Sequence, residues 1–271
     1  VLFRSNTVDL DENNTSGLLP RGGTILGTSR TNPYKEGGGG TAAIVAGLEQ
    51  AGVDALIPIG GEDTLGVADK LAADGVNAVG GLSMGALLSL KLAAERPQQV
   101  AGVGVYGATF RYDGWSIPWT AKLSFLLPLV KKLGLGRHRV FEEQHPYGLR
   151  DERLRNQVEA AMRSGDSTVA GLLGNPWHSL ADLYQLSTHV RGLLPKVTSP
   201  CLVAHASEDD VASVRNAETV MRGVSAPTEL LLLDDSYHMI TIDKERRTLI
   251  ERSARFFDTI VAGREAVPAA A

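Results

Sequence analysis

The sequence has a single cysteine, and this limits the ways in which the fold can be stabilised. Cys201 cannot form an intramolecular disulfide, so the fold does not depend on an oxidising compartment. Because Cys201 follows Pro200 at the start of an apolar run, we expect a buried strand residue and not a catalytic thiol.

Long apolar runs and blocks of like charge are also lacking. The longest apolar stretch without an acid, residues 117–130, is too short to span a membrane and contains two prolines. The net charge of −4 comes from interspersed acids and bases, which argues against a nucleic-acid footprint or a polybasic membrane surface. We therefore expect a small-molecule partner, no nucleic acid and no membrane span.

The first residues lack the pattern of a signal peptide, so we expect a cytoplasmic protein. We expect its residues 1–17 to be non-native or irregular.

The 271 residues, 43% of them hydrophobic, can bury a full core. From Thr24 onward, short apolar runs alternate with helical patterns, which is typical of an α/β fold with a mostly parallel sheet between two helical layers. The predicted strands are residues 24–28, 55–61, 76–80, 100–108, 200–206 and 228–233, and the predicted helices are residues 41–51, 63–74, 85–97 and 244–261.

Residues 111–194 do not follow this alternation. They predict an inserted, largely helical cap over the carboxyl ends of the strands, where open α/β sheets bind ligands.

The strongest chemical signal is the run Gly81-Leu82-Ser83-Met84-Gly85. It is a G-x-S-x-G motif between a predicted strand and a predicted helix, where the glycines allow a tight turn that exposes the serine hydroxyl. Ser83 is therefore a candidate nucleophile, and the backbone N–H of Met84 is a candidate oxyanion donor. An ordinary glycine-rich turn is the alternative interpretation.

A serine nucleophile needs a base and an acid that orients the base. His238 follows a predicted strand, as do three neighbouring acids, Glu208, Asp209 and Asp210. We expect His238 and the acids at the same sheet edge as Ser83. Along the chain the order is serine, acid, histidine. His205, before the acids, is expected to help shape their turn.

The motifs GLSMGA, HASEDD and DDSYHMITID resemble the α/β-hydrolase family, specifically capped carboxylesterases and monoacylglycerol-lipase-like enzymes, over about residues 80–260. The resemblance favours Asp209 as the acid, because Val211 follows it two positions later. It implies an acyl-enzyme on Ser83, with His238 as base and then acid, no cofactor, and an acyl ester substrate. The apolar run 115–129 would then contact an acyl chain, or else pack within the cap.

The runs LPRGGTILGTSRTNPYK and GVDALIPIGGEDTLGVADKLAADGVNAVG resemble the N-terminal part of phosphofructokinases, over about residues 18–80. In that family the loop that matches Gly60, Gly61, Glu62, Asp63 and Thr64 lines the phosphoryl-donor and magnesium site. The resemblance implies that Glu62 or Asp63 approaches the metal and that Arg30 approaches phosphate. The family's catalytic TIDND loop does not follow residue 80, so phosphoryl transfer lacks its base-bearing loop.

The sequence therefore predicts a chimera: a phosphofructokinase-like fragment over residues 18–80, joined to an α/β-hydrolase part over residues 81–271. Since the hydrolase's first strands and its oxyanion loop are missing, we expect impaired ester hydrolysis. Two alternatives remain, an ATP- or pyrophosphate-dependent phosphotransferase fragment and a catalytically silent chimera.

No metal site is expected. The remaining histidines lack ligand spacing and are interpreted as surface or cap-packing residues: His138, His145, His178 and His189.

Overall fold

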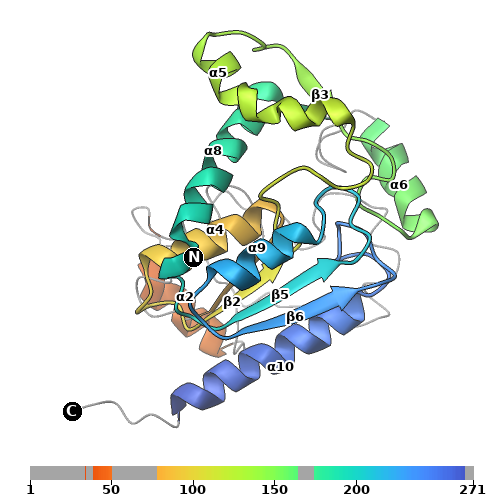
Figure 1. Ribbon diagram of the computed structural model, residues 1–271. Helices are drawn as coiled ribbons and strands as arrows, with labels where there is room; N and C mark the ends of the chain where they lie inside the picture. The colour runs from red at the N-terminus through yellow and green to blue at the C-terminus, as the bar shows by residue number, and fades with distance from the viewer. Residues whose placement is uncertain (1–33, 35–38, 51–77, 164–173, 266–271) are drawn as a thin grey trace.

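The computed structural model describes residue 34 and residues 39–50, 78–163 and 174–265 (Figure 1). The predicted strands 24–28 and 55–61 and the predicted helix 63–74 lie outside the described residues. Helix α2 (Gly40–Gln50) forms where residues 41–51 predicted it.

A parallel four-stranded sheet forms the centre of the described fold, in the order β1-β2-β5-β6. Parallel neighbours require a crossover connection. Helix α4 connects β1 to β2, and helix α9 connects β5 to β6. The bounds are β1 (Ala78–Leu82), α4 (Met84–Glu95), β2 (Gly102–Tyr106), β5 (Cys201–Ala206), α9 (Arg215–Gly223) and β6 (Thr228–Leu233).

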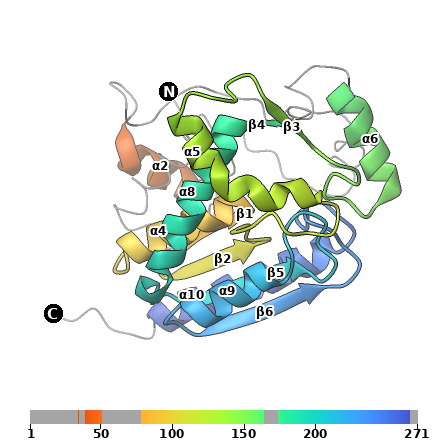
Figure 2. The same ribbon diagram turned by 45° about the horizontal axis from the view of Figure 1, so that its top comes forward.

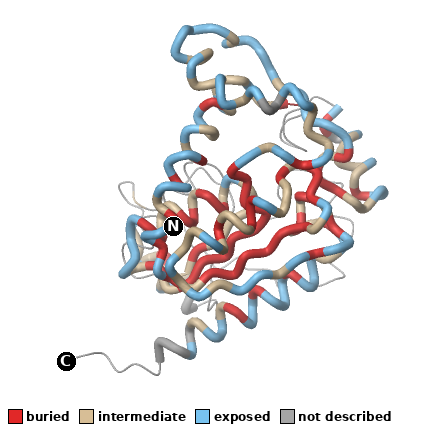
Figure 3. The backbone as a smooth tube through the Cα atoms, in the orientation of Figure 1, coloured by how far each residue is buried: buried red, intermediate tan, exposed pale blue. Residues whose placement is uncertain are grey.

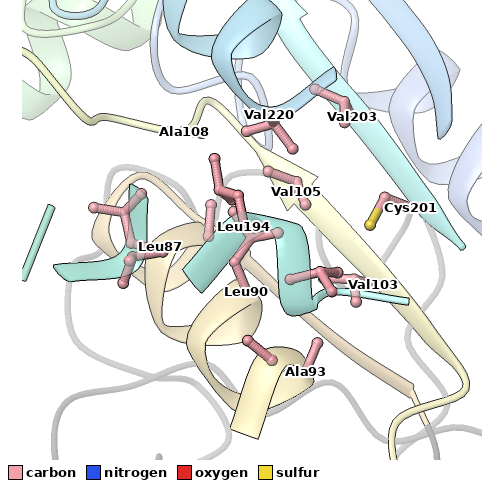
Figure 4. Packing of buried hydrophobic residues seen from close by; sticks show 14 of the residues in the cluster. Leu87, Leu90, Ala93, Val103, Val105, Ala108, Leu194, Cys201, Val203 and Val220 are labelled. Atoms are coloured by element: carbon pink, nitrogen blue, oxygen red, sulfur yellow. The ribbon is translucent and has the colours of Figure 1, made fainter. Parts of the chain in front are cut away.

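The sheet lies between two helical layers, as Figure 1 shows. Strand β5 has all six residues buried, because both of its faces are covered. Val203 packs into a core with α4 and α9, whereas its neighbours Leu202 and Ala204 pack into a second core with α10 (Arg246–Glu265). Figure 4 shows the first core between α4 and β2. The α/β prediction of a three-layer, mostly parallel sheet is confirmed.

Cys201 is fully buried in the first core, as its place beside a proline predicted. Burial raises the pKa of its thiol to about 12, so the sulfur stays protonated at neutral pH.

The cap is inserted between β2 and β5, on the side of the sheet that α4 and α9 cover (Figures 1 and 2). It is mainly helical, as predicted, but it also contains an antiparallel ribbon of β3 and β4 that the sequence did not predict. The C-terminal end of α8 leaves the cap, since Val190 packs into the first core. The elements are η2 (Trp119–Leu126), α5 (Leu127–Lys132), β3 (Val140–Glu142), α6 (Glu152–Arg163), β4 (Gly174–Pro176), α8 (Trp177–Leu193) and η3 (Leu194–Lys196).

Within the described ranges, no helix combines the length and apolarity needed to cross a bilayer.

Candidate active site

Ser83 stands alone between the last residue of β1 and the first residue of α4. Its φ of 57° lies in the left-handed region, which a non-glycine residue adopts only where the surrounding structure imposes it. A Cβ atom at Gly81 would lie 2.3 Å from the carbonyl carbon of Gly85, so only glycine fits at position 81. This contact explains the first glycine of the motif and fixes the sharp turn that carries Ser83.

The structure brings the three predicted side chains Ser83, His238 and Asp209 together at the carboxyl edge of the sheet. The Nε2 atom of His238, in the loop after β6, is 3.0 Å from the Ser83 Oγ atom. Its Nδ1 atom is 2.9 Å from the Oδ2 atom of Asp209, in the turn after β5. This order of contacts gives the histidine one nitrogen toward the hydroxyl and the other toward the carboxylate.

The geometry distinguishes the three neighbouring acids. Asp209 is buried, and its Oδ1 atom accepts N–H bonds from Val211 and Ala212, which orient the carboxylate toward His238. Glu208 is exposed and pairs with Arg150 at 2.8 Å. The turn therefore directs two consecutive acids to different partners, Glu208 to Arg150 at the surface and Asp209 to His238 inside the fold.

The electrostatics of the pair favour a charged carboxylate beside the imidazole. Burial alone would raise the pKa of Asp209, but the facing His238 and the Ala212 N–H lower it overall. Burial alone would lower the pKa of His238, but the adjacent Asp209 carboxylate raises it above its ordinary value of 6.5. An imidazolium formed at His238 is thus stabilised by its neighbour.

His205 helps shape the acid turn, as expected from its position. Its ring lies wholly inside the fold, and Nε2 donates to the Ala212 carbonyl at 2.7 Å. Burial lowers the pKa of His205, so the ring is neutral at pH 7 and supports the turn without adding charge.

Sequence reasoning missed Thr109, which lies just beyond β2 and is 1% exposed. Its hydroxyl is 3.1 Å from the Ser83 Oγ atom and 3.1 Å from the Gly107 carbonyl oxygen. A threonine after a strand carries no motif, so only the fold could reveal this contact.

Two buried aspartates, Asp210 and Asp243, hold the cap turn of residues 147–151 against the loop that carries His238. We call this pair of carboxylates the clasp; both are 0% exposed. Polar side chains are buried at this depth only when hydrogen bonds satisfy them. Here backbone N–H groups do so: Asp210 accepts from Gly148 (2.9 Å) and His238 (3.2 Å), and Asp243 accepts from Arg150 (2.8 Å), Asp151 (3.0 Å) and Tyr237 (2.8 Å).

A cleft of about 960 Å³ opens between the sheet edge and the cap. Ser83 and His238 both line it, so the Ser83 hydroxyl is accessible to a ligand. Much of the run 115–129 lines the cleft from the cap, namely Ile117, Thr120, Leu123, Ser124, Phe125, Leu126 and Leu127. The cleft therefore has the polar Ser83 and His238 in its lining together with apolar cap side chains.

The backbone N–H of Met84 is at the first position of α4, where no intrahelical acceptor is available. Among the described residues it makes no backbone hydrogen bond. It is therefore available to a ligand oxygen near Ser83.

The predicted phosphate and metal-site residues Arg30, Gly60, Gly61, Glu62, Asp63 and Thr64 lie outside the described residues. In the part of the chain that the structure describes, no three His, Cys, Asp or Glu side chains gather as metal ligands would. The cap histidines His138, His145 and His189 are exposed, and His178 is half-buried with its Nε2 atom 2.9 Å from the Leu135 carbonyl oxygen.

A parallel sheet with a serine at a strand-to-helix turn, and with a histidine and an aspartate at the same edge, defines an α/β-hydrolase fold. Residues 62–245 match the model of the Hydrolase_4 family, described as serine aminopeptidase, S33. The chain belongs to this family.

The monoacylglycerol lipase of Paleococcus ferrophilus is a solved structure with the same fold. The two chains are 15% identical, with a TM-score of 0.57 over 76% of this chain and 77% of that one. A thermostable monoacylglycerol lipase of Bacillus sp. (strain H-257) is 28% identical over 106 residues, which are 39% of this chain and 42% of the lipase.

The start of the chain matches a different family. Residues 2–83 match the phosphofructokinase model, so the two family matches overlap over residues 62–83. The pyrophosphate–fructose 6-phosphate 1-phosphotransferase of Amycolatopsis methanolica is 68% identical over 63 residues, 23% of this chain. The match spans only 18% of that relative's length. The chain is thus a chimera of phosphofructokinase-like and α/β-hydrolase segments, as its motifs predicted.

Proposed function

We propose that the chain is a serine hydrolase of carboxylic esters that works through an acyl-enzyme on Ser83. One observation carries the proposal: the Ser83 Oγ, the His238 imidazole and the Asp209 carboxylate form a continuous chain of hydrogen bonds of 3.0 and 2.9 Å beside an apolar cleft. This arrangement activates a hydroxyl for attack on an acyl carbon.

In the proposed acylation step, the Ser83 oxygen attacks the ester carbonyl carbon while its proton moves to His238 Nε2. The Asp209 carboxylate keeps the proton on Nδ1 and stabilises the imidazolium. The carbonyl oxygen becomes an anion that the Met84 N–H stabilises. The imidazolium then gives its proton to the leaving alcohol, and the carbon–oxygen bond to that alcohol breaks.

In the proposed deacylation step, His238 takes a proton from water, and the resulting hydroxide attacks the acyl carbon. The Ser83 oxygen leaves with the proton returned by His238, and a carboxylic acid is released. The apolar cap residues Leu123, Phe125 and Leu126 line the cleft and would contact the acyl chain. An apolar acyl ester, as the names of the two similar monoacylglycerol lipases suggest, is the substrate class we propose.

We further propose that turnover is weak. Hydrolases of this fold take a second oxyanion donor from a His-Gly type loop that precedes the nucleophile, and this chain has no histidine before His138. Loss of one donor typically lowers kcat by about 10²- to 10³-fold.

Phosphoryl transfer is the second candidate, because residues 2–83 match the phosphofructokinase model. Binding of ATP or pyrophosphate in the presence of Mg²⁺ would favour it. The chain has no TIDND sequence after this segment, so we propose that the segment does not catalyse the transfer.

The proposal is tested by labelling the purified chain with a fluorophosphonate probe, which reacts with activated serines. We expect one covalent adduct, located on Ser83 by mass spectrometry, and no adduct in the Ser83→Ala variant. A folded chain, by circular dichroism, that takes up no label would establish the catalytically silent chimera instead.

Ester hydrolysis should depend on pH through His238, which must be neutral to accept the serine proton. Four titratable groups surround it: Asp209, Asp210 and Glu143, which raise its pKa, and His205, which is neutral. Because the pKa is raised above 6.5, kcat/KM is expected to be full at alkaline pH and to fall through a midpoint above 6.5 as the pH decreases. A pH profile with a soluble nitrophenyl ester measures this; a midpoint well below 6.5 would contradict it.

A further inference from the structure

The outer face of the cap exposes an unusual amount of apolar surface. Among the described residues, nine of the thirteen exposed large apolar side chains lie between residues 115 and 140. Figure 3 shows this outermost part of the molecule mainly in the colour of exposed residues. Five of the nine recur at intervals of three or four along η2 and α5, namely Trp119 (73% exposed), Leu123 (50%), Leu126 (41%), Leu129 (54%) and Leu133 (63%).

The opposite side of the same helical segment is already occupied. Leu127 and Val130 line the cleft, and α5 packs against α8. Trp119, Leu129 and Leu133 do not line the cleft and are exposed, so these three side chains are left for a partner.

The charge of this segment identifies the partner. Residues 117–141 contain five Lys and Arg residues and no Asp or Glu, although the whole chain has a net charge of −4. Lys132, Arg137 and Arg139 are exposed, and no carboxylate partner is found for them among the described residues. Exposed apolar side chains and exposed cations in one stretch of chain are the two features that an anionic bilayer attracts.

The cap surface is also continuous with the cleft. Leu123, Phe125 and Leu126 are exposed and line the cleft as well. An acyl chain could therefore pass from a lipid layer to the Ser83 hydroxyl along apolar side chains. Burying the outer face in lipid covers surface that water otherwise contacts.

We propose that the outer cap surface, made of the exposed residues Trp119, Leu129, Lys132, Leu133, Arg137 and Arg139, docks onto an anionic lipid bilayer. This docking goes beyond the proposed function, because it needs no chemistry at Ser83. It also revises the expectation, drawn from the interspersed charges of the whole chain, that the protein offers no polybasic membrane surface. The exposed cations Lys132, Arg137 and Arg139 belong to the same stretch of the cap as the exposed apolar side chains.

The test is sedimentation of the whole chain with large vesicles of phosphatidylcholine alone, or of phosphatidylcholine and phosphatidylglycerol at about 70:30. We expect binding to the anionic vesicles that weakens as salt rises from about 0.1 to 1 M, because the Debye length falls from about 10 to 3 Å. Neutralising the cations in the Lys132→Gln, Arg137→Gln, Arg139→Gln variant should weaken binding by about 100-fold.

A second variant tests the contribution of the exposed apolar side chains to vesicle binding. The Trp119→Ser, Leu129→Ser, Leu133→Ser triple variant should also lose about 100-fold in vesicle affinity. None of these three side chains lines the cleft, so labelling of Ser83 should be unchanged. The matched control is Ile250→Ser, which removes an apolar side chain that is 61% exposed on α10, on the other side of the sheet. It should bind vesicles like the parent chain.

Three results would overturn the proposal. The first is that the parent chain does not sediment with anionic vesicles at low salt, and the second is that the apolar variant binds as well as the parent. The third is a concentration-dependent dimer that the same three apolar substitutions abolish, which would show that a second copy covers the surface. Labelling of Ser83 is scored separately, so failure of docking leaves the proposed ester chemistry untouched, and failure of labelling leaves the docking test intact.

Discussion

Replacing His238 with alanine is expected to lower kcat for ester hydrolysis by about 10⁴-fold or more. The imidazole is 3.0 Å from the Ser83 Oγ atom, and no other described titratable side chain contacts that oxygen. Without it the hydroxyl keeps its proton and is a poor nucleophile at neutral pH. The measurement is the initial rate with a soluble nitrophenyl ester, together with the rate of fluorophosphonate labelling.

The control for this experiment is His189→Ala, since His189 is exposed on α8 and does not line the cleft. It should leave both rates unchanged. If His238→Ala kept more than about a tenth of the parent activity, another group would be the base and the proposed mechanism would be wrong.

Asparagine in place of Asp209 is expected to lower kcat by about 10⁴-fold with the fold intact. The amide oxygen can keep the N–H bonds of Val211 and Ala212, which leaves the NH₂ group facing His238 Nδ1. An NH₂ donor there forces the imidazole proton onto Nε2, so that nitrogen can no longer accept the serine proton. Rates with the same ester, alongside thermal unfolding, separate this loss from simple destabilisation.

Glu208→Gln is the matched control, because it changes the neighbouring acid of the same turn in the same way. Glu208 is exposed and its ion pair with Arg150 is at the surface, so the substitution should change kcat by less than about two-fold. Equal losses in the two variants would show that the turn tolerates no neutral residue, and would remove the argument for Asp209 as the acid.

Much of the described fold follows from short-range patterns. The helix predicted after Ser83 over residues 85–97 is α4 (Met84–Glu95), and the apolar run from Val100 contains β2. The three side chains of the site could be predicted because parallel strands bring their carboxyl ends to one edge, so the residues that follow each strand meet. That inference needed neither the register of the strands nor the rotamers of the three side chains.

Contacts between distant segments could not be predicted. Thr109 reaches Ser83, and Asp210 and Asp243 reach a cap turn about sixty and ninety residues earlier in the chain. No local pattern marks such pairs. Helix α9 was missed as well, because its polar sequence has few apolar residues: Ala217 and Val220 are buried in the core, and Met221 packs against it. The boundary predicted between residues 80 and 81 remains a prediction.

The clasp has a practical consequence for redesign of the specificity of this enzyme scaffold. Asp210 and Asp243 accept hydrogen bonds from backbone N–H groups of residues 147–151. These bonds hold the turn in place without using its side chains. Tyr147, which lines the cleft, is thus a position for a restricted library that leaves out β-branched residues, because its φ of 58° lies in the left-handed region. Gly148 must be kept out of that library, since its φ is +74° and an added Cβ would lie 2.7 Å from the Met239 side chain.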